Sequence, residues 1–189
     1  MNRHPGGASD EETFLLFFQH LQADTANTLI DTYKEYLAQH ISLAHLQQAF
    51  VTTLRGAHTQ AAHIGRRMAG VTDPLHPADE AFAQTVMFEQ ARYLSGLIGD
   101  IRGGLDSQSE VIRRLRMYAT RLLGTMNRTW AMAQPVGTML KWVLHPAEHC
   151  QDCESRAAGG PYDAYTIPWV PGDGSSECTV NCKCTLEVV

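Results

Sequence analysis

Apolar residues recur every three to four positions along most of the first 135 residues, which is the spacing of one face of an α-helix. Four segments share this pattern, and Gly, Pro and helix-capping residues separate them. The first follows Ser9, which has capping-box spacing to Glu12, and it places Phe14 and Phe18 on one face. Because no segment here alternates apolar and polar residues as a strand would, the pattern predicts an all-α body.

Turn and cap residues set the boundaries of the later helices. The pattern restarts near Ser42 and ends near Gly70, while the break around His40 is not fixed by the sequence. Prolines within 73–77 predict a turn that leads into a third helix, which a glycine pair at 103–104 ends.

The last helix of the body is predicted to start at a capping box formed by Ser107 and Glu110 and to stop near Gln134. Each predicted helix has an apolar face that another element must cover, so a bundle of three to five helices is expected. The histidines of this region, including His58 and His63, are expected at surface or partner-facing positions.

The composition changes after residue 137. Residues 138–189 contain all five cysteines and little helical periodicity, and the segments 139–144 and 184–188 predict two short strands. The sequence therefore predicts a mainly α protein with a helical body over 1–137 and a Cys-rich zinc-binding module over 138–189.

The overall composition is that of a globular chain, with 44% hydrophobic residues, 19% charged residues and a net charge of −5 over 189 residues. No apolar run reaches the roughly 18 residues that a membrane helix needs, so no membrane partner is expected. The first ten residues lack the pattern of a secretory signal, so we expect a reducing cytoplasm. In that compartment, clustered cysteines favour metal or redox chemistry over disulfides.

The cysteines form two groups that bracket a Gly/Pro-rich loop. Cys150 and Cys153 have Cys-x2-Cys spacing, and the second group follows about 25 residues later. Zinc takes four tetrahedral ligands, and its binding stabilises a loop that has little core of its own. We therefore predict one structural zinc ion, with His149 as a weaker candidate ligand. The candidate ligands are Cys150, Cys153, Cys182 and Cys184, with Cys178 able to replace one of the last two.

Three other chemistries are possible for these cysteines. A Cys-x2-Cys pair can be a thioredoxin-like redox motif, but that motif normally opens a helix within a βαβ unit, which the body does not offer. Disulfides would leave one of the five thiols unpaired. A nucleophile formed by Cys150 with His145 or His149 lacks a marked orienting group and oxyanion hole. The sequence thus favours a non-enzymatic protein with no small-molecule substrate.

The last predicted helix of the body is rich in arginine, although the chain as a whole is acidic. Only Glu110 is a nearby acid in the sequence. A basic face can contact phosphates or an acidic partner, whereas a solvated face is the default interpretation. The candidate contact residues are Arg113, Arg114, Arg116, Arg121 and Arg128.

The Cys-rich module resembles the C-terminal region of tailed-phage minor head proteins, the Mu-type head morphogenesis family. The likeness lies in the apolar string at 142–144, the segment 146–153 with its Cys-x2-Cys, Pro171-Gly172, and the cysteines within 178–184. In that family the ending is typically His-Pro-x-Cys-Arg-Cys. Here Lys183 replaces the usual Arg, and Cys178 lies close to where the missing His would fall.

If the family's His binds metal, Cys178 would replace it, and the ligands would be Cys150, Cys153, Cys178 and one of Cys182 or Cys184. The resemblance further implies a minor structural component of the virion, assembled in the bacterial host cytoplasm. Its expected partners are the portal or the major capsid protein, with packaged DNA as a further candidate contact. The alternative functions are a zinc-knuckle nucleic-acid-binding protein and a thiol oxidoreductase.

Overall fold

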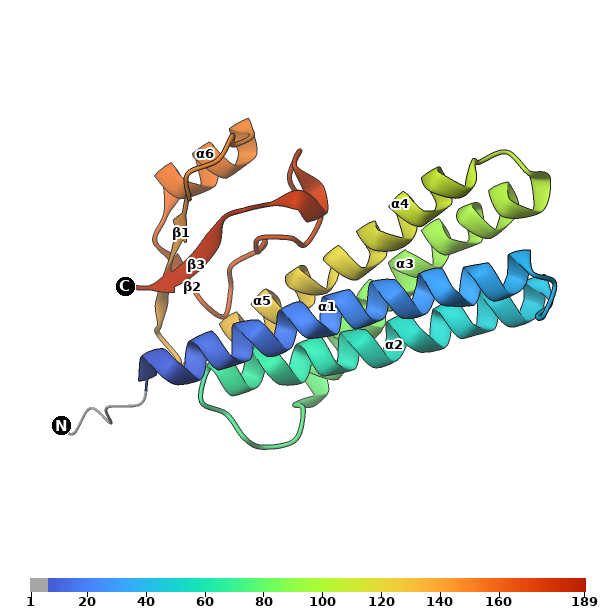
Figure 1. Ribbon diagram of the computed structural model, residues 1–189. Coiled ribbons are helices and arrows are strands. Elements are labelled where there is room, and N and C mark those ends of the chain that lie inside the picture. The colour runs from blue at the N-terminus through green and yellow to red at the C-terminus, as the bar shows by residue number, and fades with distance from the viewer. Residues whose placement is uncertain (1–6) are drawn as a thin grey trace.

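The computed structural model describes residues 7–189, and side chains from residue 12 onward. Its body is helical, and its C-terminal part holds a small sheet, which confirms the mainly α fold class. Figure 1 shows α1 and α2 side by side along the length of the body, with α3, α4 and α5 packed over them. The helices of the body are α1 (Gly7–Leu37), α2 (Leu43–Met68), α3 (Pro77–Gly103), α4 (Gln108–Thr120) and α5 (Leu122–Met132).

The first helix begins at Gly7, two residues before the predicted cap at Ser9, and continues without interruption to Leu37. The break that the sequence left open therefore lies just after Leu37, where Gln39 adopts a positive φ of 61°. Ser42 then caps α2 as predicted, because its side chain accepts a hydrogen bond from the His45 N–H.

The start of α3 agrees with the predicted turn. Pro77 is the first helical residue, the His76 side chain accepts a hydrogen bond from the Ala78 N–H, and the Asp79 carboxylate accepts one from the His76 N–H. Asp79 is buried and also forms an ion pair of 2.6 Å with Arg66 of α2. The turn at 73–77 is thus tied to the end of the preceding helix.

The prediction of one last helix is wrong, because the segment divides at Arg121 into α4 and α5. The Gly124 N–H bonds to the Arg121 carbonyl three residues back, which tightens the turn there. Ser107 caps α4 as predicted by accepting the Glu110 N–H, but the Glu110 carboxylate pairs with Arg113 at 2.6 Å instead of closing the capping box.

The main core lies between α1, α2, α3 and α4. Leu29, Phe50, Leu54, Leu97 and Leu115 are completely buried in it. These residues come from four different helices at helical spacing, so the body is stabilised chiefly by the burial of apolar faces. None of the described helices has both the length and the apolarity needed to cross a bilayer.

The C-terminal module contains β1 (Met139–Val143), α6 (Gln151–Gly159), β2 (Tyr162–Asp163), the 3₁₀ helix η1 (Thr179–Asn181) and β3 (Thr185–Val188). The strands form an antiparallel sheet in the order β2-β1-β3, and both predicted strands are present. Helix α6 was not predicted, because its nine residues carry little apolar periodicity.

The module packs on α5 through backbone groups of its loop. Asn127 donates a 2.9 Å hydrogen bond to the Pro171 carbonyl, and Arg128 donates to the carbonyls of Ile167 and Pro168. A Cβ atom at Gly124 would lie 2.6 Å from the Asp173 Cα, so the close approach requires glycine there.

The contact between α2 and α5 is equally close at Gly65. A Cβ atom there would lie 2.3 Å from both the Met126 carbonyl oxygen and the Thr129 Oγ1. We expect Gly65→Ala to destabilise the fold by about 3 kcal/mol, because backbone on α5 must shift. Gly56→Ala on the same helix is the control, since nothing lies within 4 Å of its added methyl, and it should be neutral or stabilising by about 0.5–1 kcal/mol. Urea unfolding of the two variants tests this, and equal midpoints would contradict it.

His58 lies completely buried, contrary to its predicted surface position, whereas His63 is exposed. The His58 Nδ1 pairs with the Thr125 Oγ1 at 2.7 Å, while its Nε2 lacks a hydrogen-bond partner. Burial lowers the pKa of His58 to about 4. The nearby Gln90 amide raises this pKa and so opposes part of the shift, although it forms no hydrogen bond with the ring.

We expect this buried histidine to make the fold acid-sensitive. The unfolded state takes up a proton below the ordinary His pKa of 6.5 and the folded state only near pH 4, so stability falls as the pH drops between these values. The loss between pH 7.5 and 5 should be about 2 kcal/mol and should be smaller in His58→Gln. Denaturant unfolding across this range measures it, with His63→Gln as the exposed control. A His58→Gln curve parallel to the wild type would refute it.

Candidate metal centre

Three short elements of the C-terminal module position the cysteines. Cys150 is the N-cap of α6, and Cys153 lies in its first turn, so that one turn of helix places both sulfurs on the same side. Cys178 and Cys182 flank η1. Cys184 directly precedes β3. Because Thr185 of β3 pairs with Val143 at the end of β1, Cys184 lies near the segment that leads from β1 into α6.

All five sulfurs converge, with Cys153 at the centre. Its Sγ lies 3.5 Å from that of Cys150, 3.6 Å from that of Cys178 and 3.6 Å from that of Cys182. The five cysteines are free thiols. They form two trios within which the sulfurs lie within 4.8 Å of one another, Cys150/Cys153/Cys178 and Cys153/Cys182/Cys184.

Aromatic and charged side chains pack around the cysteine cluster. Trp142 of β1 is buried in the same cluster, and Trp169 packs edge-on against it at 6.3 Å. The Arg156 guanidinium lies over both rings, at 5.3 Å and 4.8 Å from their centroids. Asp152 accepts a hydrogen bond from the Glu177 N–H at 2.9 Å, which fixes α6 to the loop that carries Cys178.

The thiol pKa values differ across the cluster. Burial raises the pKa of Cys153, of Cys178 and of Cys182, and the thiols around Cys153 raise its pKa further. Burial also opposes ionisation of Cys150, but hydrogen bonds from the backbone N–H groups of Cys153 and Cys178 outweigh it and lower the pKa of Cys150 to about 7. A bound cation would have to displace the protons of the buried thiols.

The chemistry of these donors fits a metal ion. Thiolates are soft ligands that select zinc, copper(I) or iron–sulfur clusters over magnesium or calcium. Cys150, Cys153 and Cys178 form one trio, and Cys182 and Cys184 form the other with Cys153. The structure therefore brings every sequence-predicted cysteine to one centre that can hold a metal.

His149 also lies beside the cluster. Its Nδ1 is 3.7 Å from the Cys184 Sγ, and its Nε2 is 2.6 Å from the His145 carbonyl oxygen. The sequence marked this residue only as a weaker candidate, because its ring position depends on the turn before α6.

The arginines of α4 and α5 do not form a free basic face. Acids remote in the sequence pair with them: Arg114 contacts Asp100 and Asp106, and Arg121 contacts Glu89. Arg113 pairs with Glu110, and Arg128 binds loop carbonyls and lies 5.8 Å from the centre of the Phe82 ring. Arg116 is exposed and forms no ion pair with the described residues.

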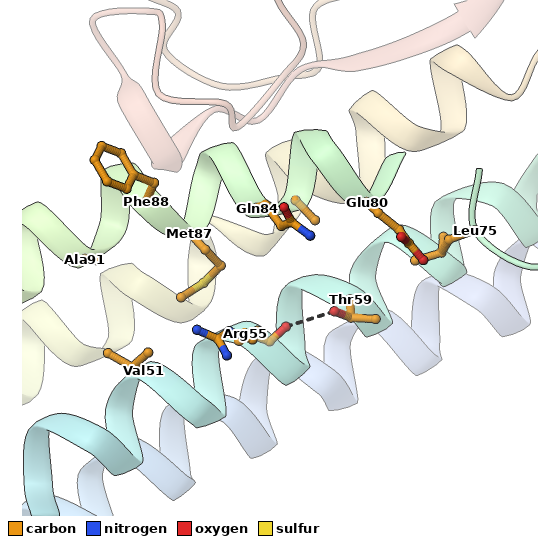
Figure 2. A pocket seen from close by; sticks show the side chains of 10 residues that line it. Val51, Arg55, Thr59, Leu75, Glu80, Gln84, Met87, Phe88 and Ala91 are labelled. Atoms are coloured by element: carbon orange, nitrogen blue, oxygen red, sulfur yellow. Dashed lines mark hydrogen bonds between the residues drawn. The ribbon is translucent and has the colours of Figure 1, made fainter. Parts of the chain in front are cut away.

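A separate groove of about 520 Å³ lies between α2 and α3, away from the thiols. Figure 2 shows Met87 pointing from α3 toward α2. Val51, Arg55 and Leu75 also line it, and it contains no cysteine or histidine. Its lining offers no metal-binding chemistry of the kind found in the C-terminal module.

No protein family, curated protein or solved structure matches the chain. The likeness to Mu-type head morphogenesis proteins stays a prediction from the sequence.

We expect the chain to bind metal through this centre and Cys153→Ser to lose it, since Cys153 belongs to both trios. Ser155→Ala, at an exposed position of the same helix, should retain it. Elemental analysis of reduced, dialysed protein gives the metal content, and thermal unfolding with and without a chelator should show a lower midpoint after metal removal. Wild-type protein that takes up no metal under reducing conditions would disprove the assignment.

Proposed function

We propose that this chain is a structural protein of phage head morphogenesis, in which one zinc-bound thiol centre makes the C-terminal module a rigid docking element. The observation that carries the proposal is the convergence of five sulfurs around Cys153 from both ends of the module. A cation bound there would link α6, η1 and β3 into one unit. That unit is held on α5 by Asn127 and Arg128.

Zinc is the ion that this donor set favours. Zinc–sulfur bonds of about 2.3 Å place tetrahedral sulfurs about 3.8 Å apart. The sulfur–sulfur distances of 3.5 Å and 3.6 Å around Cys153 are close to that value. An excess of thiols leaves no need for a water ligand, and zinc sites closed in this way are structural. This supports a non-enzymatic role.

The exterior of the module supports a role in contact with a partner. Tyr165 and Val188 of the module are large apolar residues that expose 71% and 55% of their surface. Exposed large apolar side chains of this kind are available for contact with a partner. The portal or the major capsid protein is the partner that the family resemblance implies, in the virion and during its assembly in the host cytoplasm.

Thiol–disulfide exchange is the second candidate function. Cys150 and Cys153 open a helix with their sulfurs 3.5 Å apart, as in redox Cys-x2-Cys motifs. A redox pair needs only two thiols, however, whereas three more surround this one. The small sheet is also antiparallel and lacks a βαβ unit among the described residues. Reduction of an insulin disulfide by the metal-free chain would favour this alternative.

A zinc-knuckle nucleic-acid-binding function has less support. Four of its five candidate arginines contact groups of the chain itself, which leaves Arg116 as an exposed cation. Steeply salt-dependent DNA binding would be its signature.

Copurification tests the proposed function. The full chain, tagged and coexpressed with the portal or major capsid protein encoded beside it, should retain that protein. Cys150→Ser/Cys153→Ser should reduce its recovery at least about tenfold, because the docking unit is no longer rigid. Gln151→Ala, exposed between the two cysteines, is the control and should behave as the wild type. Equal recovery with the double variant, or none with the wild type, would contradict the proposal.

A further inference from the structure

The centre contains more donors than one ion can use. A tetrahedral zinc ion takes four ligands, whereas five sulfurs and the His149 ring gather here. The sulfurs also do not form one compact group, since the two trios share only Cys153. An ion that binds within one trio therefore leaves donors of the other trio without a metal.

We propose that the centre binds two zinc ions, bridged by the thiolates of Cys153 and Cys182, with His149 as a ligand of the second ion. This inference rests on the proposed metal centre and changes its ion count from one to two. The first ion is bound by Cys150, Cys153, Cys178 and Cys182. The second ion is bound by Cys153, Cys182, Cys184 and His149.

The count of donors agrees with this arrangement. Each ion has four ligands when two thiolates are shared, so six side chains complete both coordination shells. The two shared sulfurs lie 3.6 Å apart, as neighbouring ligands of the same ion should. Cys182 belongs to the second trio, and it closes the first shell by moving toward Cys178. Cys182 lies in the segment between η1 and β3, which has no regular secondary structure.

His149 is prepared to act as a ligand. Its Nε2–H donates a 2.6 Å hydrogen bond to the His145 carbonyl, which leaves the lone pair on Nδ1. A second-shell bond of this kind orients metal-binding histidines and fixes their tautomer. The Nδ1 lies 3.7 Å from the Cys184 Sγ, close to the roughly 3.6 Å that separates an imidazole nitrogen and a thiolate on one tetrahedral zinc ion.

The charge of the site also favours a second cation. Cys153, Cys182 and Cys184 are buried, and an anionic thiolate in such a place needs a compensating charge. One divalent ion on four thiolates leaves a net negative site, whereas a second ion brings two positive charges with only one further thiolate, that of Cys184. Lys183 is exposed between two of these cysteines and does not replace the cation.

Zinc stoichiometry of the full chain tests the inference. Reduced, metal-free protein is titrated with Zn²⁺ against a chromophoric chelator, and bound zinc per chain is confirmed by elemental analysis. The wild type should saturate at about two ions, and His149→Ala at about one with an unchanged circular dichroism spectrum. His149→Cys should restore about two, because a thiolate replaces the imidazole. His145→Ala is the matched control, since its ring bonds the Thr185 Oγ1 outside the cluster, and it should keep about two.

X-ray absorption at the zinc edge of the saturated wild type provides a measurement that does not depend on the variants. Two ions that share thiolates give metal–metal scattering, and one ion cannot. Saturation of the wild type at one ion would overturn the inference and leave the single-ion centre in place. Two ions in His149→Ala would overturn the assignment of His149 as a ligand of the second ion. A wild type that binds no zinc would overturn both.

Discussion

Five thiol groups that lie within a few ångströms of one another in a partly buried pocket can ionise together only if a cation lies among them. The C-terminal module depends on this constraint. The long loop between β2 and β3 has one short 3₁₀ helix, and its backbone is fixed by few regular hydrogen bonds. The module has only small buried clusters, around Val170 and around Trp142. A metal ion bound at Cys153 would add to the stability of this loop.

The centre is placed by the helical body as well as by its own ligands. The loop before Cys178 lies on α5, where Gly124 allows the backbone of Asp173 to approach and Arg128 donates to loop carbonyls. Helix α5 is itself held against α2 by the close approach at Gly65. A rigid connection therefore extends from the long helices to the thiols, so that a partner bound to the module would be held in a fixed position relative to the body.

Most of the candidate arginines of the body are paired with other groups of the chain. Arginines that look free in the sequence pair with acids from other elements, as Arg114 does with Asp100 and Asp106. These pairs are partly exposed and contribute little stability, but they occupy the guanidinium groups that phosphates would need. Tyr165 and Val188 of the module, in contrast, are large apolar residues with exposed side chains.

The sequence by itself determined the elements that local patterns encode. The helical body, the Ser42 start, the proline turn before α3, the end at Gly103 and the two main strands follow from periodicity, caps and turn residues, and these act within a few positions of the chain. The clustering of cysteines in the sequence likewise indicated a metal centre. Only the tertiary structure decided the division of the last helix at Arg121, the burial of His58, the pairing of the arginines and the place of His149 beside Cys184. The last three depend on contacts between residues far apart in sequence, and no local pattern records which distant side chain will be the neighbour.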